Sequence, residues 1–77
     1  MREEHKEKFK RIGLKIGYYR KLKGHTQETL AEAVDLTTAF IGQVECGARG
    51  ISLDNIFAIA EVLDVPAWKF FKYEDDL

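Results

Sequence analysis

Two short apolar patterns separated by a break constrain this 77-residue chain more than any other feature of its sequence. Residues 27–34 and 38–46 each place apolar side chains at the three- and four-residue spacing of a helix face. Residues 35–36 interrupt the pattern between them. Thr26 and Thr37 precede the two segments, where a hydroxyl can accept a hydrogen bond from the first turn of a helix. The pattern predicts two short helices joined by a tight turn.

The side chains that such a turn requires are present. Apolar residues must fill the angle between the helices and seal it onto a preceding helix, and one residue must be small where the second helix passes over the first. The residues that meet these demands are Leu30, Val34, Leu36, Ile41, Val44 and Ala31. The residue that opens the turn should tolerate a left-handed backbone, and Asp35 is of a type that does. The pattern indicates a helix-turn-helix, whose second helix is free to enter the major groove of DNA.

A longer amphipathic helix precedes these two and ends at Gly24. Its apolar residues recur at helical spacing: Phe9, Ile12, Ile16, Tyr19 and Leu22. Gly13 and Gly17 lie inside it, and each costs about 1 kcal/mol relative to alanine. We therefore expect a neighbouring element to pack closely against this helix at the glycines.

Two further segments complete the predicted fold. Ser52 is a good N-cap for a fourth helix. The inward face of that helix comprises Leu53, Ile56, Ile59, Ala60 and Leu63. Pro66 suits the first turn of a short fifth helix that contains Trp68, Phe70 and Phe71. The expected fold is all-α, a compact five-helix single domain over residues 1–77, with a flexible or frayed extension at 1–8 and an acidic tail at 73–77.

Charge is distributed unevenly along the chain, although the net charge is only −1. Residues 1–25 carry nine Lys or Arg against three Glu, a net charge of +6, whereas residues 26–49 and 50–77 carry −3 and −4. A basic first quarter can supply phosphate contacts, while the acidic C-terminal part would face away from nucleic acid. The alternative is that the basic stretch is an ordinary solvated helix face.

Other classes of function find little support. His5 and His25 are isolated and belong to no nucleophile–base set, so we do not expect an enzyme. One cysteine and two distant histidines give no metal-ligand spacing, and no cofactor or small-molecule ligand is expected. Cys46 has no partner for an internal disulfide, which fits a reducing cytosol, and a redox-sensing thiol is the lesser alternative. No membrane span or signal peptide is evident, so a cytoplasmic protein is expected.

A family resemblance rests on residues 26–31 (TQETLA) and 41–47 (IGQVECG). Both runs resemble the phage repressor/Cro-like (Xre-type) family of helix-turn-helix domains, which have the lambda-repressor-like fold, and the similarity extends over roughly residues 9–71. Residues 41–56 are most similar to the controller proteins of restriction–modification systems. The resemblance implies a transcription regulator that binds double-stranded DNA as a homodimer.

The resemblance also implies roles for individual residues. The positions expected at DNA phosphates are Gln27 and Arg49, which the resemblance implies, together with Lys23 and Thr26. Gln27 matches a phosphate-binding position at a helix N-terminus, with an ordinary polar residue as the alternative. Arg49 matches a position near phosphate, and an ordinary surface arginine is an equal alternative. Arg20 and Glu45 match an internal ion pair between the first and third helices, which would position the third helix rather than touch DNA.

The exposed face of the third helix is expected to read bases. Its candidate residues are Thr37, Thr38, Ala39, Phe40 and Gln43. Gln43 can hold adenine through N6 and N7, and the threonine and alanine methyl groups suit the thymine methyl group. Controller-type members usually carry arginine and tyrosine where this chain has Thr38 and Phe40. Residues 36–44 hold no charge, so non-specific affinity must come from elsewhere.

Three aromatic residues exceed what a small monomeric core would bury: Phe57, Trp68 and Phe71. They either fill the core around the fifth helix, as expected of Phe70, or form a homodimer surface. A dimer would read two half-sites about 34–36 Å apart. The competing function is a protein-interaction or antitoxin-like module that kept this fold but lost DNA affinity, which the uncharged third helix would permit.

Overall fold

The computed structural model describes residues 1–72, and this part of the chain is all-helical. Four α-helices follow one another, with a 3-10 turn at each end. They are η1 (Glu3–His5), α1 (Lys6–Leu22), α2 (Gln27–Ala33), α3 (Thr38–Glu45), α4 (Leu53–Leu63) and η2 (Ala67–Phe70). This confirms the all-α prediction, with the fifth helix reduced to the 3-10 turn η2. The predicted acidic tail, 73–77, lies outside the described residues.

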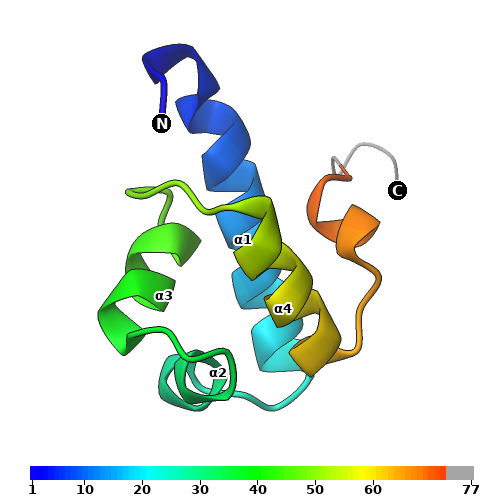
Figure 1. Cartoon of the computed structure of the whole chain (residues 1–77). Coiled ribbons are helices and arrows are strands. Elements are labelled where there is room, and N and C mark those ends of the chain that lie inside the picture. The colour runs from blue at the N-terminus through cyan, green and yellow to red at the C-terminus, as the bar shows by residue number, and fades with distance from the viewer. Residues whose placement is uncertain (73–77) are drawn as a thin grey trace.

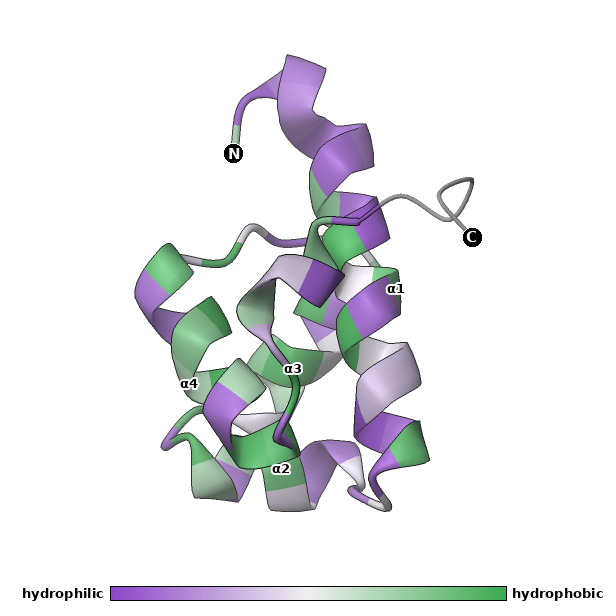
Figure 2. Cartoon of the chain, turned by 90° about the vertical axis from the view of Figure 1, so that its right-hand side faces the viewer, coloured by the Kyte–Doolittle hydropathy of each residue, from purple (hydrophilic) through white to green (hydrophobic). Residues whose placement is uncertain are grey.

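The helices are arranged around α1, which runs along the whole domain (Figure 1). Helices α3 and α4 and the turn η2 all pack on α1, and α2 contacts both α3 and α4. The core is made of the buried apolar side chains of these elements: Ile16, Leu30, Ala31, Ile41, Val44, Ile51, Ile56, Ile59, Ala60, Leu63, Val65 and Phe70. The N-terminal turns of α1 project beyond the other helices and are hydrophilic (Figure 2). The helices that position α3 therefore share a single hydrophobic core.

Three helices begin at the hydroxyl residues that the sequence predicts as N-caps. The side chains of Thr26, Thr37 and Ser52 each accept a hydrogen bond from the backbone N–H three residues ahead, at N···O distances of 3.0, 3.0 and 3.2 Å. An N-cap of this kind stabilises a helix by about 1 kcal/mol. The caps set where α2 and α3 begin, and so which side chains lie on the exposed side of α3.

The turn between α2 and α3 has the left-handed residue that the sequence predicts. Asp35 has φ 59°, and the next residue, Leu36, donates its backbone N–H to the Ala31 carbonyl at 2.9 Å. This closes the end of α2 in the manner of a Schellman motif. Asp64 is also left-handed, with φ 56°, and ends α4. Sequence analysis missed that second site, because an aspartate among apolar residues gives no distinctive signal.

Some sequence expectations differ from the structure. Within the segment 1–8, for which a flexible or frayed extension is predicted, residues 3–8 are helical and Lys6 pairs with Glu3 at 3.0 Å, and the fraying stays a prediction. Leu22 and Leu53 are expected to face inward, yet they are 62% and 59% exposed. Leu22 lies six residues after buried Ile16 and therefore about 120° around the helix from it. Leu53 is the first residue of α4 and precedes the turns of that helix that join the core.

Candidate nucleic-acid interface

Helix α3 is attached to the domain along one side and is open to solvent along the other. Ile41 and Val44 are fully buried in the core. The residues predicted to read bases divide into two groups. Thr37, Thr38, Ala39 and Gln43 are exposed, whereas Phe40 is half-buried and packs against the core. The exposed face is thus polar or methyl-bearing and lacks charge.

The position of α3 depends on a close approach to α1 at Gly13. A β-carbon at this residue would overlap the carbonyl group of Val44 on α3. A helix backbone can approach another this closely only where a side chain is absent. This is the close packing that the glycines of the first helix led us to expect. It sets the distance between the two helices near the C-terminus of α3.

Further along α1, the Arg20–Glu45 ion pair joins the same two helices. Arg20 donates from Nε to Oε2 of Glu45 at 2.7 Å and from Nη2 to Oε1 at 3.1 Å, the two-point geometry of a guanidinium–carboxylate pair. Both side chains are nearly buried, at 9% and 10% exposure. Gly17 leaves room for the carboxylate, since its β-carbon would lie 3.1 Å from Oε1. The structure therefore contains the ion pair expected from the sequence.

The same two side chains extend the network to the start of α2. Arg20 Nη1 donates to the His25 carbonyl at 2.8 Å, and Gln27 Nε2 donates to Glu45 Oε1 at 3.0 Å. Gln27, the first residue of α2, is therefore hydrogen-bonded to the last residue of α3. Sequence analysis placed Gln27 at a phosphate and missed this contact, because the three partners come from three different helices. The phosphate contact stays a prediction.

The other predicted phosphate residues lie on two sides of α3. Lys23 and Thr26 are exposed where α1 gives way to α2, on the same side as Gln27. Arg49 is exposed in the loop after α3, and its guanidinium lies 5.3 Å from the centroid of the Phe40 ring. Phe40 and Gly42, the residue of α3 that faces Gln27, are about 200° apart around the helix. The reading face is thus flanked by Gln27 on one side and by Arg49 on the other.

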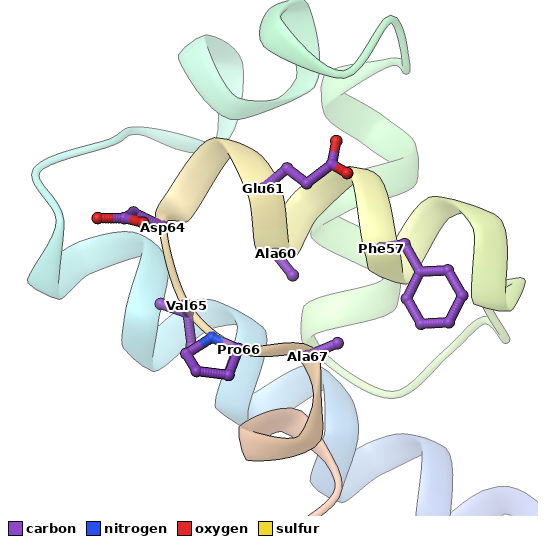
Figure 3. A pocket seen from close by; sticks show the side chains of 7 residues that line it. All are labelled: Phe57, Ala60, Glu61, Asp64, Val65, Pro66 and Ala67. Atoms are coloured by element: carbon purple, nitrogen blue, oxygen red, sulfur yellow. The ribbon is translucent and has the colours of Figure 1, made fainter.

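The three aromatic residues predicted for a dimer surface are exposed on α4 and around η2. Phe57, Trp68 and Phe71 are 49%, 58% and 43% exposed, while Phe70 is fully buried as expected. Phe57 also borders a hollow between α4 and the segment leading into η2, with Ala60, Pro66 and Ala67 beside it (Figure 3). The core of one chain therefore leaves each of these three side chains, which we group as the aromatic surface, partly exposed.

The side chains of the cysteine and of the histidine near α2 each make a local contact. Cys46 is exposed, and its Sγ donates to the Gln43 carbonyl at 3.4 Å. The Nδ1 atom of His25 lies 3.0 Å from the Thr29 hydroxyl. Within residues 1–72, no three histidine, cysteine or acidic side chains gather as a metal site. None of the helices in this range is both long and apolar enough to cross a bilayer.

Comparison with known proteins gives one consistent result. A family model described as "Helix-turn-helix" matches residues 16–67. The uncharacterized HTH-type transcriptional regulator YazB of Bacillus subtilis is 40% identical over 55 residues, which cover 71% of this chain and 80% of YazB. The HTH-type transcriptional regulator DicA of Escherichia coli is 38% identical over 65 residues, and the match spans 83% of this chain but only 48% of DicA.

A solved structure extends the comparison to three dimensions. The restriction–modification controller protein C.AhdI from Aeromonas hydrophila superimposes with a TM-score of 0.84 at 35% sequence identity. The match covers 90% of this chain and all of C.AhdI.

Proposed function

Since the chain belongs to the Xre-type helix-turn-helix family of DNA-binding transcription regulators, we propose that it binds a specific operator as a homodimer and regulates transcription from it. The observation that carries the proposal is the exposed face of α3, where Thr37, Thr38 and Gln43 are open to solvent while the Gly13 contact and the Arg20–Glu45 pair hold the helix on α1. Rigid positioning matters because base contacts need hydrogen-bond geometry.

In this proposal α3 enters the major groove, with its exposed residues at the base edges. Gln43 makes a bidentate contact with adenine, and Thr37, Thr38 and Ala39 meet thymine methyl groups or base edges. Lys23, Thr26 and Gln27 contact phosphates on one side of the groove, and the amide of Gln27 exchanges or shares its bond to Glu45. The contacted base pairs are therefore predominantly A·T, with deformability of the DNA adding specificity.

Dimerisation through the aromatic surface would set the spacing of two inverted half-sites. Aromatic residues concentrate at the cores of protein interfaces, and a two-fold dimer places two α3 helices about one turn of DNA apart. A domain of this size also gains stability from a partner, since it buries only about 60% of its unfolded surface. The similarity to C.AhdI over that protein's whole length favours a cytoplasmic controller of a restriction–modification system among the members of the family.

Selection of bound duplexes from a random DNA pool tests the proposal directly. We expect an inverted repeat with A·T-rich contacted positions and an affinity that falls as salt concentration rises. A random duplex serves as the control for non-specific binding.

The competing function makes the opposite prediction. A protein-interaction or antitoxin-like module with the same fold would show neither sequence enrichment nor salt-dependent retention on DNA. The observation that favours it is the absence of any charged residue between positions 36 and 44. Loss of both signals in the selection would overturn the regulator proposal and leave the interaction module as the competing function.

A further inference from the structure

Phe40 and Arg49 form a contact pair at the edge of the reading face. The Arg49 guanidinium carbon lies 5.3 Å from the Phe40 ring centroid, within the range of a cation–π interaction. Phe40 itself is half-buried, because its ring also packs against the hydrophobic core. The ring is therefore fixed by the core on one side and supports a cation on the other.

The donors of Arg49 are available to a ligand. Within residues 1–72 its guanidinium makes no hydrogen bond and no ion pair, so its contact in the free protein is with the face of the Phe40 ring. A cation–π contact uses none of the five N–H donors of a guanidinium in a hydrogen bond to oxygen, so these donors can bind a planar pair of acceptors. Residues 36–44 contain no lysine or arginine, and Arg49 is the cationic residue that lies nearest to α3 in the sequence.

We propose that Phe40 is a positioning residue, whose ring holds the Arg49 guanidinium beside α3 so that Arg49, and not Phe40, contacts DNA on this flank. The inference rests on the proposed DNA-binding function and adds a pair of residues that positions one of its DNA contacts. The ligand chemistry is a pair of hydrogen-bond acceptors in one plane, which two phosphate oxygens or the O6 and N7 atoms of guanine supply. It replaces the sequence-based prediction that Phe40 touches base edges itself.

A double-mutant cycle on the selected operator tests the inference. The wild type, Phe40→Leu, Arg49→Ala and the double variant are compared by fluorescence anisotropy at two salt concentrations. When Arg49 is present, we expect Phe40→Leu to weaken binding about two- to five-fold for each half-site, the size of an exposed cation–π contact, and so about four- to 25-fold for the dimer on its operator. The same substitution should have almost no effect in the Arg49→Ala background, while Phe40→Tyr should keep wild-type affinity.

The salt and sequence dependence identify the acceptor. If Arg49 binds phosphate, Arg49→Ala lowers the salt slope by about 1 for each half-site, about 2 for the dimer, and leaves base preference unchanged. If Arg49 binds guanine, the variant relaxes preference at one G·C pair of each half-site. Phe40→Leu should retain the wild-type slope in either case, because the charge remains.

Two controls separate this role from a change in stability. Melting temperatures show whether each variant is folded at the temperature of the assay. Tyr18→Leu removes an aromatic ring of comparable size from the exposed face of α1 and should leave affinity unchanged. An equal loss from Phe40→Leu in both backgrounds would overturn the inference alone, since Phe40 would then act without Arg49. Absence of DNA binding by the wild type would overturn the proposed function and the inference together.

Discussion

At the scale of single residues, Glu45 is the side chain that connects the three helices around the candidate interface. Its carboxylate accepts hydrogen bonds from Arg20 on α1 and from Gln27 on α2, so it ties both helices to the end of α3. The charge of Glu45 has little access to water, and its partners must compensate for that loss of solvation. The expected consequence is that this network controls both the stability of the domain and the placement of the reading face.

Arg20→Ala should destabilise the domain by about 3 kcal/mol, because it leaves a nearly buried carboxylate without its cation. For a domain of this size, that corresponds to a melting temperature lower by more than about 10 °C, measured by circular dichroism. Binding to all DNA sequences should weaken together, since α3 is displaced. Lys21→Ala, at an exposed neighbour, is the matched control. A variant with normal stability that lost only phosphate affinity would show that Arg20 contacts DNA directly.

Gln43→Ala should relax preference at one base pair of each half-site, since a bidentate amide contact is worth about 1–3 kcal/mol of discrimination. The slope of affinity against salt should stay almost unchanged, because no charge is lost. Gln27→Ala is the contrasting variant, expected to weaken binding evenly across sequences through lost phosphate contact. The measurement is a repeated binding selection on each variant. Identical sites selected with identical stringency by Gln43→Ala would exclude Gln43 from base reading.

At the scale of helices, the packing of α1 on α3 depends on glycine. The two helices meet where a β-carbon at Gly13 would overlap a backbone carbonyl, and a backbone cannot move away as a flexible side chain can. The glycine at position 42 of α3 is a different case. A β-carbon there would lie 3.4 Å from Gln27 Oε1, which is the end of a flexible side chain.

These two helix glycines therefore form a matched pair of tests. Gly13→Ala should destabilise the domain by about 1–3 kcal/mol, the usual cost of overpacking, despite the better helix propensity of alanine. Gly42→Ala should be neutral or stabilising by up to about 1 kcal/mol, because the propensity gain is not opposed by a rigid neighbour. Chemical denaturation of both variants measures the difference. Equal effects would mean that the helices are not in close contact at Gly13.

At the scale of the whole molecule, two surfaces are predicted to bind different partners. The reading face of α3 is polar and uncharged, and the aromatic surface lies on α4 and around η2. Trp68 is also close to two cations, with Lys69 Nζ and Lys72 Nζ each 5.8 Å from its ring. An aromatic surface of this exposure is expected to be covered by a second copy of the chain.

Trp68→Ala combined with Phe57→Ala should shift the monomer–dimer equilibrium toward monomer by at least about tenfold, since large aromatic anchors dominate interfaces. Sedimentation equilibrium measures the dissociation constant, and operator affinity should fall with it because two half-sites are no longer bound together. Tyr18→Ala, which removes an equally exposed aromatic residue from α1, is the control. A dissociation constant that only the Tyr18 variant changes would move the dimer surface to α1.

Local interactions explain what could be predicted from the sequence by itself. Helix positions follow from apolar spacing, helix starts from Thr26, Thr37 and Ser52, and the turn from Asp35, because each depends on neighbours within a few residues. The Arg20–Glu45 pair was expected only through family resemblance, since its members are 25 residues apart. The family and its helix-turn-helix motif could therefore be recognised from the order of the residues.

The tertiary structure decided the contacts that join residues distant in the chain. It placed the Gln27 amide on Glu45, seated Arg49 on the Phe40 ring, and turned Leu22 and Leu53 toward solvent. Spacing within a helix determines its apolar face, but which part of that face is covered depends on where the other helices cross it. Phe40 shows the physical reason most clearly: its place in α3 follows from the sequence, whereas its half-burial and its cation come from the core and from a loop nine residues away.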